Sequence, residues 1–190
     1  MAPYTVWSFV LIAIVVPPPF ATEGKGANNS GITQRKTIKP LGFLISRRIY
    51  VNLTTRYDPA IRCIEEITKK WNPKTRILSK WVAVKSSWWW RYDEVEYKAV
   101  RKGVWVTLGR SENTTYTFYN TSHYCTIVKK ETNKSGGHNI DNCELWVNEK
   151  FLGEPENEES CTKNFKEYCK HNATRYNYED CRYTGKPILV

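Results

Sequence analysis

Six cysteines are the residues of this sequence whose number and placement most directly indicate a chemistry. An even number suits disulfide bonds in an oxidising compartment, and a metal site is the competing interpretation. The chain has no Cys-x-x-Cys pair and its histidines are dispersed, so disulfides are favoured over a metal ion. Several pairings are possible in principle among Cys63, Cys125, Cys143, Cys161, Cys169 and Cys181.

Asn-x-Ser/Thr sequons form a second pattern with a chemical meaning, because each can accept an N-linked glycan in a secreted protein. One sequon is weak evidence, but several in a chain of 190 residues favour a glycoprotein. A glycan needs an outward-facing position, so we expect these asparagines at the surface. The sequons begin at Asn28, Asn52, Asn113, Asn120, Asn133 and Asn172.

Residues 1–22 have the features of a secretory signal peptide. The apolar run Val6–Val16 is too short to span a bilayer, which needs about 20 residues, and Pro17–Pro19 then stop any helix. Ala21 and Thr22 offer small residues for cleavage. No second apolar stretch of spanning length follows, so we predict a secreted, extracellular and monomeric protein without a membrane span.

Composition and charge narrow the classes of function. Apolar residues make up 41% of the chain and charged residues 25%, which is typical of a globular protein and excludes a disordered polyampholyte. The 29 Lys and Arg residues outnumber the 19 Asp and Glu residues, and the net charge of +10 tolerates anionic partners. No nucleic-acid-binding motif accompanies the scattered basic residues, so DNA and RNA are not expected as partners.

Short runs rich in Val, Ile, Thr, Tyr and Trp predict a mostly β domain. The connections are short, so the strands should pair in sequence and antiparallel, as a closed meander or a sandwich. A helical spacing of apolar residues follows at Glu158–His171. We expect a polar segment at 23–47 and the folded domain at 48–190. The expected strands are Arg48–Arg56, Arg62–Lys69, Arg76–Lys85, Tyr92–Val100, Val104–Leu108, Thr114–Asn120, Tyr124–Lys130 and Asn142–Asn148.

Side-chain alternation along the last two strands predicts which residues point inward. If the helix packs outside and disulfides join it to these strands, their cysteines point outward. Thr126 and Glu144 then point inward, and Trp146 shares the face of Glu144. An interior carboxylate is costly unless it is paired, solvated or facing a ligand. Glu144 is therefore a candidate ligand-binding acid, with a purely structural partner as the alternative.

The same alternation applies to the first strand. A glycan on Asn52 would place that side chain outward. Ile49, Val51, Leu53 and Thr55 would then point inward. The interior beside this strand is accordingly expected to be apolar.

A longer pattern joins the cysteines to Glu144. Cys125-Thr126-Ile127 is followed after 16 residues by Glu144-Leu145-Trp146 and, after 14 more, by Cys161. This spacing resembles the tick salivary lipocalins, the histamine-binding protein family, and the similarity covers roughly residues 49–181. It implies an eight-stranded antiparallel lipocalin-like barrel with the C-terminal α-helix packed on the outside. It also implies the disulfides Cys63–Cys181, Cys125–Cys161 and Cys143–Cys169.

The resemblance further implies a function. It predicts a salivary protein that sequesters a small host mediator, either a biogenic amine such as histamine or serotonin or a lipid mediator, to suppress host inflammation or immunity. No cofactor is implied. Amine-binding relatives typically have Asp where this chain has Thr126, and an aromatic residue expected near Thr55 is absent. Asp58 and Glu144 match retained acids, so the expected ligand-binding residues are Glu144, Asp58, Trp146, Thr126 and Thr55.

Three consecutive tryptophans, Trp88, Trp89 and Trp90, support an alternative function. Adjacent side chains alternate across a strand, so at least one indole should lie outside or on a rim, where it could anchor a host protein or cell surface. The alternative is a protein- or cell-binding immune modulator whose cavity is vestigial or lipid-filled. An enzyme is not expected, since the sequence has no serine-nucleophile motif and no phosphate-binding glycine loop.

Overall fold

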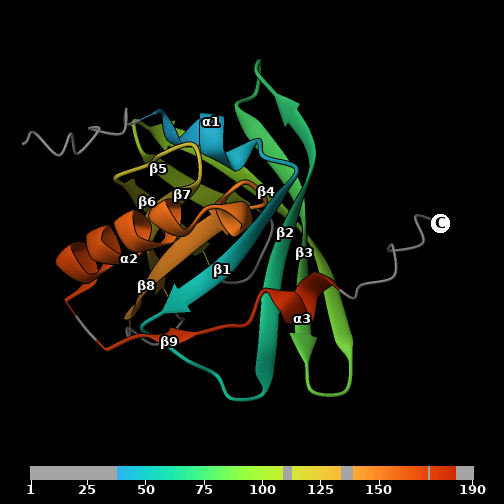
Figure 1. The fold of residues 1–190 in the computed structure, drawn as a ribbon. Helices are drawn as coiled ribbons and strands as arrows, with labels where there is room; N and C mark the ends of the chain where they lie inside the picture. The colour runs from blue at the N-terminus through green and yellow to red at the C-terminus, as the bar shows by residue number, and fades with distance from the viewer. Residues whose placement is uncertain (1–37, 109–112, 134–138, 171, 183–190) are drawn as a thin grey trace, which may run out of the picture. The chain divides into compact units, whose positions relative to one another are not determined.

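The computed structural model describes residues 38–108, 113–133, 139–170 and 172–182 (Figure 1). The expected signal peptide at 1–22 and the sequon at Asn28 lie outside these residues. The strands of the described part are β1 (Arg48–Thr54), β2 (Ile61–Asn72), β3 (Ile77–Ser86), β4 (Trp90–Arg101), β5 (Val104–Leu108), β6 (Asn113–Tyr119), β7 (Cys125–Asn133), β8 (Asn139–Asn148) and β9 (Thr174–Arg175). Its helical segments are α1 (Pro40–Leu44), η1 (Phe151–Gly153), α2 (Pro155–Cys169) and α3 (Glu179–Arg182).

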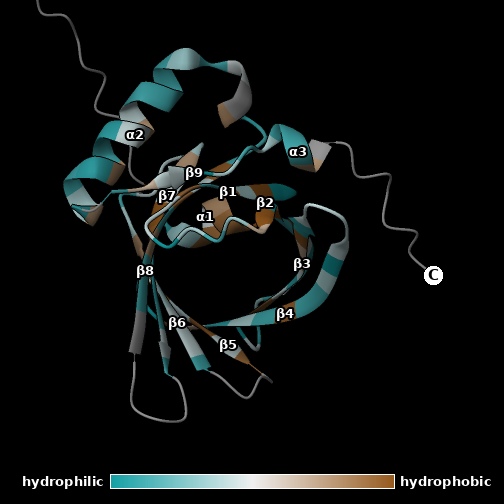
Figure 2. Cartoon of the chain, turned by 90° about the horizontal axis from the view of Figure 1, so that it is seen from below, coloured by the Kyte–Doolittle hydropathy of each residue, from teal (hydrophilic) through white to brown (hydrophobic). Residues whose placement is uncertain are grey.

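The strands close into a barrel because β1 pairs with β2 as well as with β8. Tyr50 of β1 lies opposite Glu65 of β2 on one side and opposite Val147 of β8 on the other. Neighbouring strands otherwise follow the chain from β2 to β8, all antiparallel, and Figure 2 shows them arranged in a ring. The eight-stranded antiparallel barrel is therefore confirmed, and the sandwich is excluded.

Local chemistry explains the boundaries of the outer helix. α2 begins at Pro155, a residue well suited to the first helical turn, and carries Glu156 and Glu158 in that turn, where they favour the positive end of the helix dipole. It ends at Cys169, followed by Lys170 in the left-handed conformation with φ 50°. The helix thus starts and stops a few residues earlier than the apolar spacing predicts.

α1 lies at one end of the barrel, near the β2–β3 turn (Figure 1). It belongs to the segment that we expected to be polar, yet Phe43 and Leu44 are buried in the interior core. The Thr68 hydroxyl of β2 donates hydrogen bonds to the carbonyls of Leu44 and Ser46, which tie the end of α1 to the barrel wall. The folded domain therefore begins before residue 48.

A second apolar cluster, in addition to the interior core, lies outside the barrel, where α2 packs against β7 and β8 (Figure 1). The Cys125–Cys161 and Cys143–Cys169 disulfides join these strands to α2, with Cα separations of 6.3 and 5.9 Å. The Cys63–Cys181 disulfide joins β2 to α3 at 5.7 Å. These are the pairs that the resemblance implies. Since the strand cysteines face outward, their neighbours Thr126 and Glu144 face the interior.

A β-bulge at Asn52 changes the alternation within β1. The β1–β8 register shifts between Val51 and Leu53, so Val51 faces the interior core whereas Leu53 packs in the outer layer. The expected inward placement of Leu53 is wrong for this reason. Asn52 is only 1% exposed, and its amide nitrogen and oxygen have no hydrogen-bond partner within the described ranges. The expected surface position of this sequon is therefore also wrong.

Candidate functional site

Glu144 lies inside the barrel at the centre of a hydrogen-bonded group. β8 places it opposite Val128 of β7 and Thr54 of β1, and it is only 3% exposed. Its Oε2 accepts a hydrogen bond from Nε1 of Trp146 at 2.6 Å, and its Oε1 accepts one from Nδ2 of Asn142 at 2.7 Å. Asn142, Glu144 and Trp146 lie two residues apart on one face of β8, so a single strand orients the carboxylate.

Lys130 of β7 supplies a cation to this carboxylate. Its Nζ lies 3.2 Å from Oε1 of Glu144 and 5.6 Å from the centre of the Tyr116 ring. Burial lowers the pKa of Lys130, but the negative groups around it, Glu144 foremost, raise that pKa by more, so the ammonium is charged at neutral pH. The Lys130 side chain is 27% exposed, whereas that of Glu144 is only 4% exposed.

A second ion pair lies in the same interior, on β2 and β3. Nζ of Lys80 lies 3.1 Å from Oε2 of Glu66, and the Tyr97 hydroxyl donates a hydrogen bond to Oε1 of Glu66 at 2.7 Å. Burial lowers the pKa of Lys80, and Glu66 only partly offsets this effect. Burial and the charge of Glu66 raise the pKa of Tyr97 well above its usual value, so its hydroxyl stays protonated and holds the carboxylate.

Aromatic rings connect the two ion pairs. Tyr97 packs edge-on against Tyr116 with ring centres 5.2 Å apart, and Tyr116 packs against Trp146 at 5.9 Å. Phe118 contacts the other side of this cluster, with its ring centre 5.8 Å from that of Trp146. We call these residues the interior site: Glu66, Lys80, Tyr97, Tyr116, Phe118, Lys130, Asn142, Glu144 and Trp146. Aromatic side chains beside oriented polar groups are typical of small-molecule sites.

Comparison with protein families identifies what this barrel is. Residues 54–183 match the family model described as tick histamine binding protein. The chain belongs to this family. The match includes both interior ion pairs and all three disulfides of this histamine-binding family member. The curated proteins compared with it contain no match.

Solved lipocalins share the fold of this family member at low sequence identity. A deswapped triple mutant of bovine odorant-binding protein is 13% identical, with a TM-score of 0.51, over 70% of this chain and 93% of that one. AM182 in complex with serotonin is 13% identical, with a TM-score of 0.53, over 74% and 90%. The odorant-binding protein OBP1 is 10% identical, with a TM-score of 0.53, over 74% and 94%. At such identities the likeness shows the lipocalin fold alone.

Thr126, where the family resemblance led us to expect an Asp, lies apart from Glu144. It faces the interior and is fully buried, but β7 places it opposite Trp146 and not opposite Glu144. Its hydroxyl is hydrogen-bonded to the Thr121 hydroxyl at 2.8 Å and donates to the Tyr119 carbonyl at 3.3 Å. In this family member Thr126 therefore fastens the β6–β7 turn.

Asp58 and Thr55 do not join Glu144 directly. Asp58 is exposed in the β1–β2 connection, where its Oδ1 accepts a hydrogen bond from the Ala60 amide at 2.9 Å and so stabilises the turn. The Thr55 hydroxyl lies 3.1 Å from Oδ1 of Asn142. Thr55 thereby orients the amide that donates to Glu144.

Sequence reasoning did not find the interior lysines. The alternation that places Thr126 inward also places Lys130 inward, because the two are four residues apart on β7. Strand alternation in the sequence could therefore have predicted the inward position of Lys130. On β3, no disulfide or sequon fixes the faces of the strand, so the sequence gives no comparable signal for Lys80.

Proposed function

We propose that this chain is a secreted salivary protein of a tick that sequesters a small host mediator in its barrel and thereby suppresses host inflammation or immunity. Family membership and the lipocalin fold support sequestration of a small molecule. The family resemblance implies two mediator classes, namely biogenic amines such as histamine or serotonin and lipids. The interior site favours a lipid mediator.

The Lys130–Glu144 ion pair is the observation that favours a lipid over an amine. An ammonium ligand needs a carboxylate that is free to pair with it, whereas Glu144 already pairs with Lys130 at 3.2 Å. Two ammonium groups about 4 Å apart repel each other by about 4 kcal/mol at an effective dielectric constant of about 20. Lys80 occupies Glu66 in the same way. An amine would therefore have to displace a lysine of the protein.

A lipid can bind in the interior site without displacing either lysine. Its apolar chain can pack against the rings of Tyr116, Phe118 and Trp146, at about 25 cal/mol per Å² of apolar surface removed from water. Its polar group can approach the Lys130 side chain, which is 27% exposed. The odorant-binding proteins and the serotonin complex of AM182 carry names of different ligand classes on one fold. Interior side chains must therefore set the class.

The disulfides and the exposed sequons support secretion and glycosylation. Three disulfides are typical of proteins that fold in an oxidising compartment. None of the helices in the described segments is long and apolar enough to cross a membrane. Asn113, Asn133 and Asn172 are exposed and so are open to a glycan.

Native mass spectrometry of the secreted protein tests the proposal. We expect a lipid to co-purify, or added arachidonate to be retained, and Lys130→Gln to weaken that retention because it removes the interior cation. Lys129→Gln is the matched control, since Lys129 is the neighbouring residue and pairs with Glu131 on the outer face. Retention of an amine in place of lipid, or an equal loss in both variants, would contradict the proposal.

Trp88 and Trp89 favour the alternative function, a protein- or cell-binding modulator. They lie in the β3–β4 hairpin, which the Ser86 amide closes by donating to the Trp89 carbonyl at 3.0 Å. Because β4 begins only at Trp90, strand alternation does not apply, and Trp88 is 94% and Trp89 55% exposed. Exposed indoles on a rigid hairpin are suited to anchor a protein partner.

A further inference from the structure

The α1 end of the barrel carries a pocket of about 730 Å³, within the range of about 300–1,000 Å³ that is typical of small-molecule sites. It opens beside α1, between the ends of β2, β3, β4 and β5. We propose that this pocket, called the α1-end pocket below, binds a small anionic amphiphile and is a second ligand site, separate from the interior site.

The inner lining of the α1-end pocket is apolar. Trp71 and Trp105 line it together, with ring centres 5.9 Å apart. Trp105 is only 4% exposed and Ala99 only 9%, so both belong to the interior core and form the deep part of the pocket. Ile38 and Leu41 complete it on the α1 side. An aliphatic chain or a flat ring fits such a lining, since it would remove apolar surface from water.

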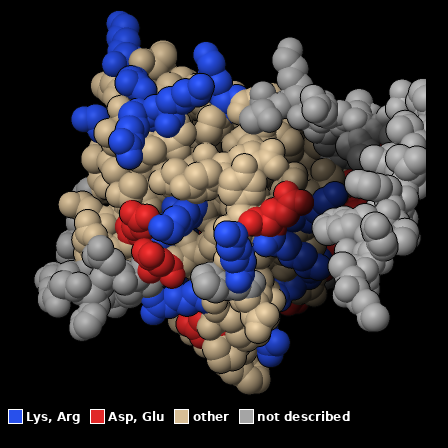
Figure 3. Space-filling model, turned by 90° about the vertical axis from the view of Figure 1, so that its left-hand side faces the viewer, with Lys and Arg blue, Asp and Glu red and all other residues tan. Residues whose placement is uncertain are grey.

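The outer lining of the pocket is cationic. Four of its lining residues are basic and none is acidic, namely Lys39, Arg76, Arg101 and Lys102. In the part of the chain that the structure describes, none of the four forms an ion pair. Figure 3 shows Lys and Arg side chains gathered at the upper end of the molecule, without Asp or Glu among them. An acidic group on a ligand would therefore find open cationic partners there.

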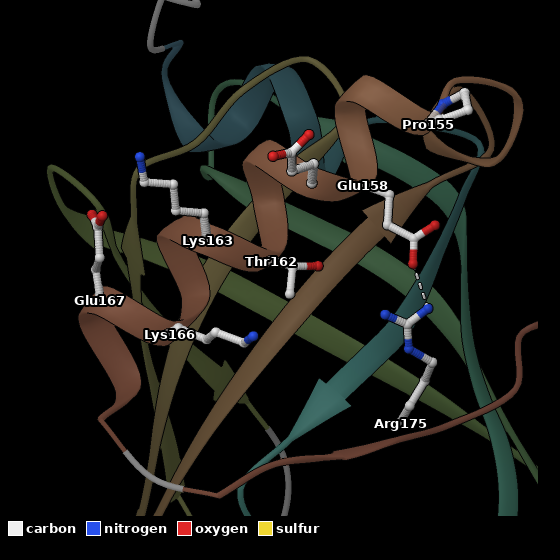
Figure 4. A pocket seen from close by; sticks show the side chains of 8 residues that line it. Pro155, Glu158, Thr162, Lys163, Lys166, Glu167 and Arg175 are labelled. Atoms are coloured by element: carbon white, nitrogen blue, oxygen red, sulfur yellow. Dashed lines mark hydrogen bonds and ion pairs between the residues drawn. The ribbon is translucent and has the colours of Figure 1, made fainter.

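The groove between α2 and β9 is a useful comparison, because it is a second charged pocket of the same protein. It has a similar volume, about 700 Å³, but it combines three acids, Glu158, Glu159 and Glu167, with three bases, Lys163, Lys166 and Arg175. Figure 4 shows Glu158 and Arg175 pointing toward one another, and their ion pair measures 2.6 Å. These six side chains sum to no net charge, so the groove does not favour a ligand of one sign. The α1-end pocket differs in having one sign of charge over an indole lining.

The depth of the pocket favours a small ligand over a membrane surface. A flat bilayer would meet the basic rim but not the Trp105 ring, which is recessed to 4% exposure. The segment that precedes Ile38 does not complement the pocket either, because residues 23–37 contain Lys25, Arg35 and Lys36 against one acid, Glu23. A free amphiphile with one acidic group fits the pocket, because its apolar part can contact the inner lining and its acidic group can pair with the basic outer lining.

Dodecanoate, with dodecanol and dodecyltrimethylammonium as neutral and cationic analogues of equal chain length, tests this site by calorimetry. We expect Arg101→Gln combined with Lys102→Gln to weaken dodecanoate binding by about tenfold, since two charge-assisted contacts are lost. Lys163→Gln combined with Lys166→Gln changes the net charge equally in the α2–β9 groove and should leave binding unchanged. Both pairs are exposed, so both variants should fold.

A dodecanoate that carries a photoreactive diazirine locates the binding. We expect cross-links in residues 38–41, 71–76 or 99–105, and the same cross-links in Lys130→Gln, which alters only the interior site. The proposal would be overturned by cross-links confined to residues 125–146, by equal weakening in the two charge variants, by equal affinity for dodecanol, or by binding to anionic vesicles without binding to free dodecanoate.

Discussion

Nζ of Lys130 lies 3.2 Å from a carboxylate oxygen of Glu144, where an ammonium ligand would have to place its own nitrogen. The barrel thus contains the counter-ion of its own acid. Lys80 stands in the same relation to Glu66, at 3.1 Å. The proposed function rests on this relationship, since each interior acid is already paired with a lysine on the neighbouring strand.

Asn52→Leu should raise the free energy of unfolding by about 1–2 kcal/mol, because the buried amide of Asn52 has no hydrogen-bond partner among the described residues. Urea unfolding measures the change. Asn113→Leu, at an exposed sequon, is the control and should have little effect. Glycopeptide mapping should find Asn52 unmodified. A glycan on Asn52, or a loss of stability in the leucine variant, would show that β1 is arranged differently.

Trp88→Ser should leave the free energy of unfolding within about 0.5 kcal/mol of the unmodified protein, because this indole is 94% exposed. Trp90→Ser should lower it, since Trp90 is half-buried and stacks on Tyr92 with ring centres 5.9 Å apart. If the hairpin binds host cells or proteins, Trp88→Ser should reduce binding in a cell-binding assay while the free energy of unfolding stays unchanged. Unchanged cell binding in Trp88→Ser would remove the support for the protein-binding alternative.

Stability should fall above about pH 10, the pKa of tyrosine in an unfolded chain. Burial and Glu66 raise the pKa of Tyr97 in the folded protein, so its contribution is fully present below about pH 10 and is lost as the pH rises through the folded pKa. Lys80 has the opposite sign: burial lowers its pKa, so its contribution grows as the pH approaches about 10 from below.

Urea unfolding between about pH 8 and pH 11 separates these contributions. Tyr97→Phe should lower stability by about 1–3 kcal/mol at pH 8, because Glu66 loses a buried donor, and should flatten the decline above about pH 10. A decline as steep as that of the unmodified protein would mean that Tyr97 is not the group responsible.

Most of the barrel could be predicted from the sequence because its strands carry strong local signals. β5 has the predicted bounds, Val104–Leu108, and the turn before it contains Gly103, which adopts a positive φ of 74°. The inward placement of Glu144 followed from alternation once the cysteines faced the helix. The disulfide pairs followed from the family pattern and not from the residues alone.

The parts that the sequence did not predict depend on contacts between distant segments. The bulge at Asn52 breaks the alternation on which the assignment of Leu53 rested, and a bulge in one strand is visible only in its register with β8. Lys80 is inside because Glu66 and Tyr97, on the two strands that flank β3, offset the cost of burying its charge. A lysine in a strand sequence otherwise indicates the solvent face.

Calorimetric titration of Lys130→Met with histamine and serotonin, beside the unmodified protein and Lys129→Met, tests the central claim most directly. Methionine keeps an apolar stem and removes the ammonium, so Glu144 becomes available while Trp146 and Asn142 still orient it. We predict that Lys130→Met binds at least one of the amines, with an affinity at least about tenfold above any binding by the other two proteins. Saturable amine binding by the unmodified protein that Lys130→Met does not strengthen would contradict the account.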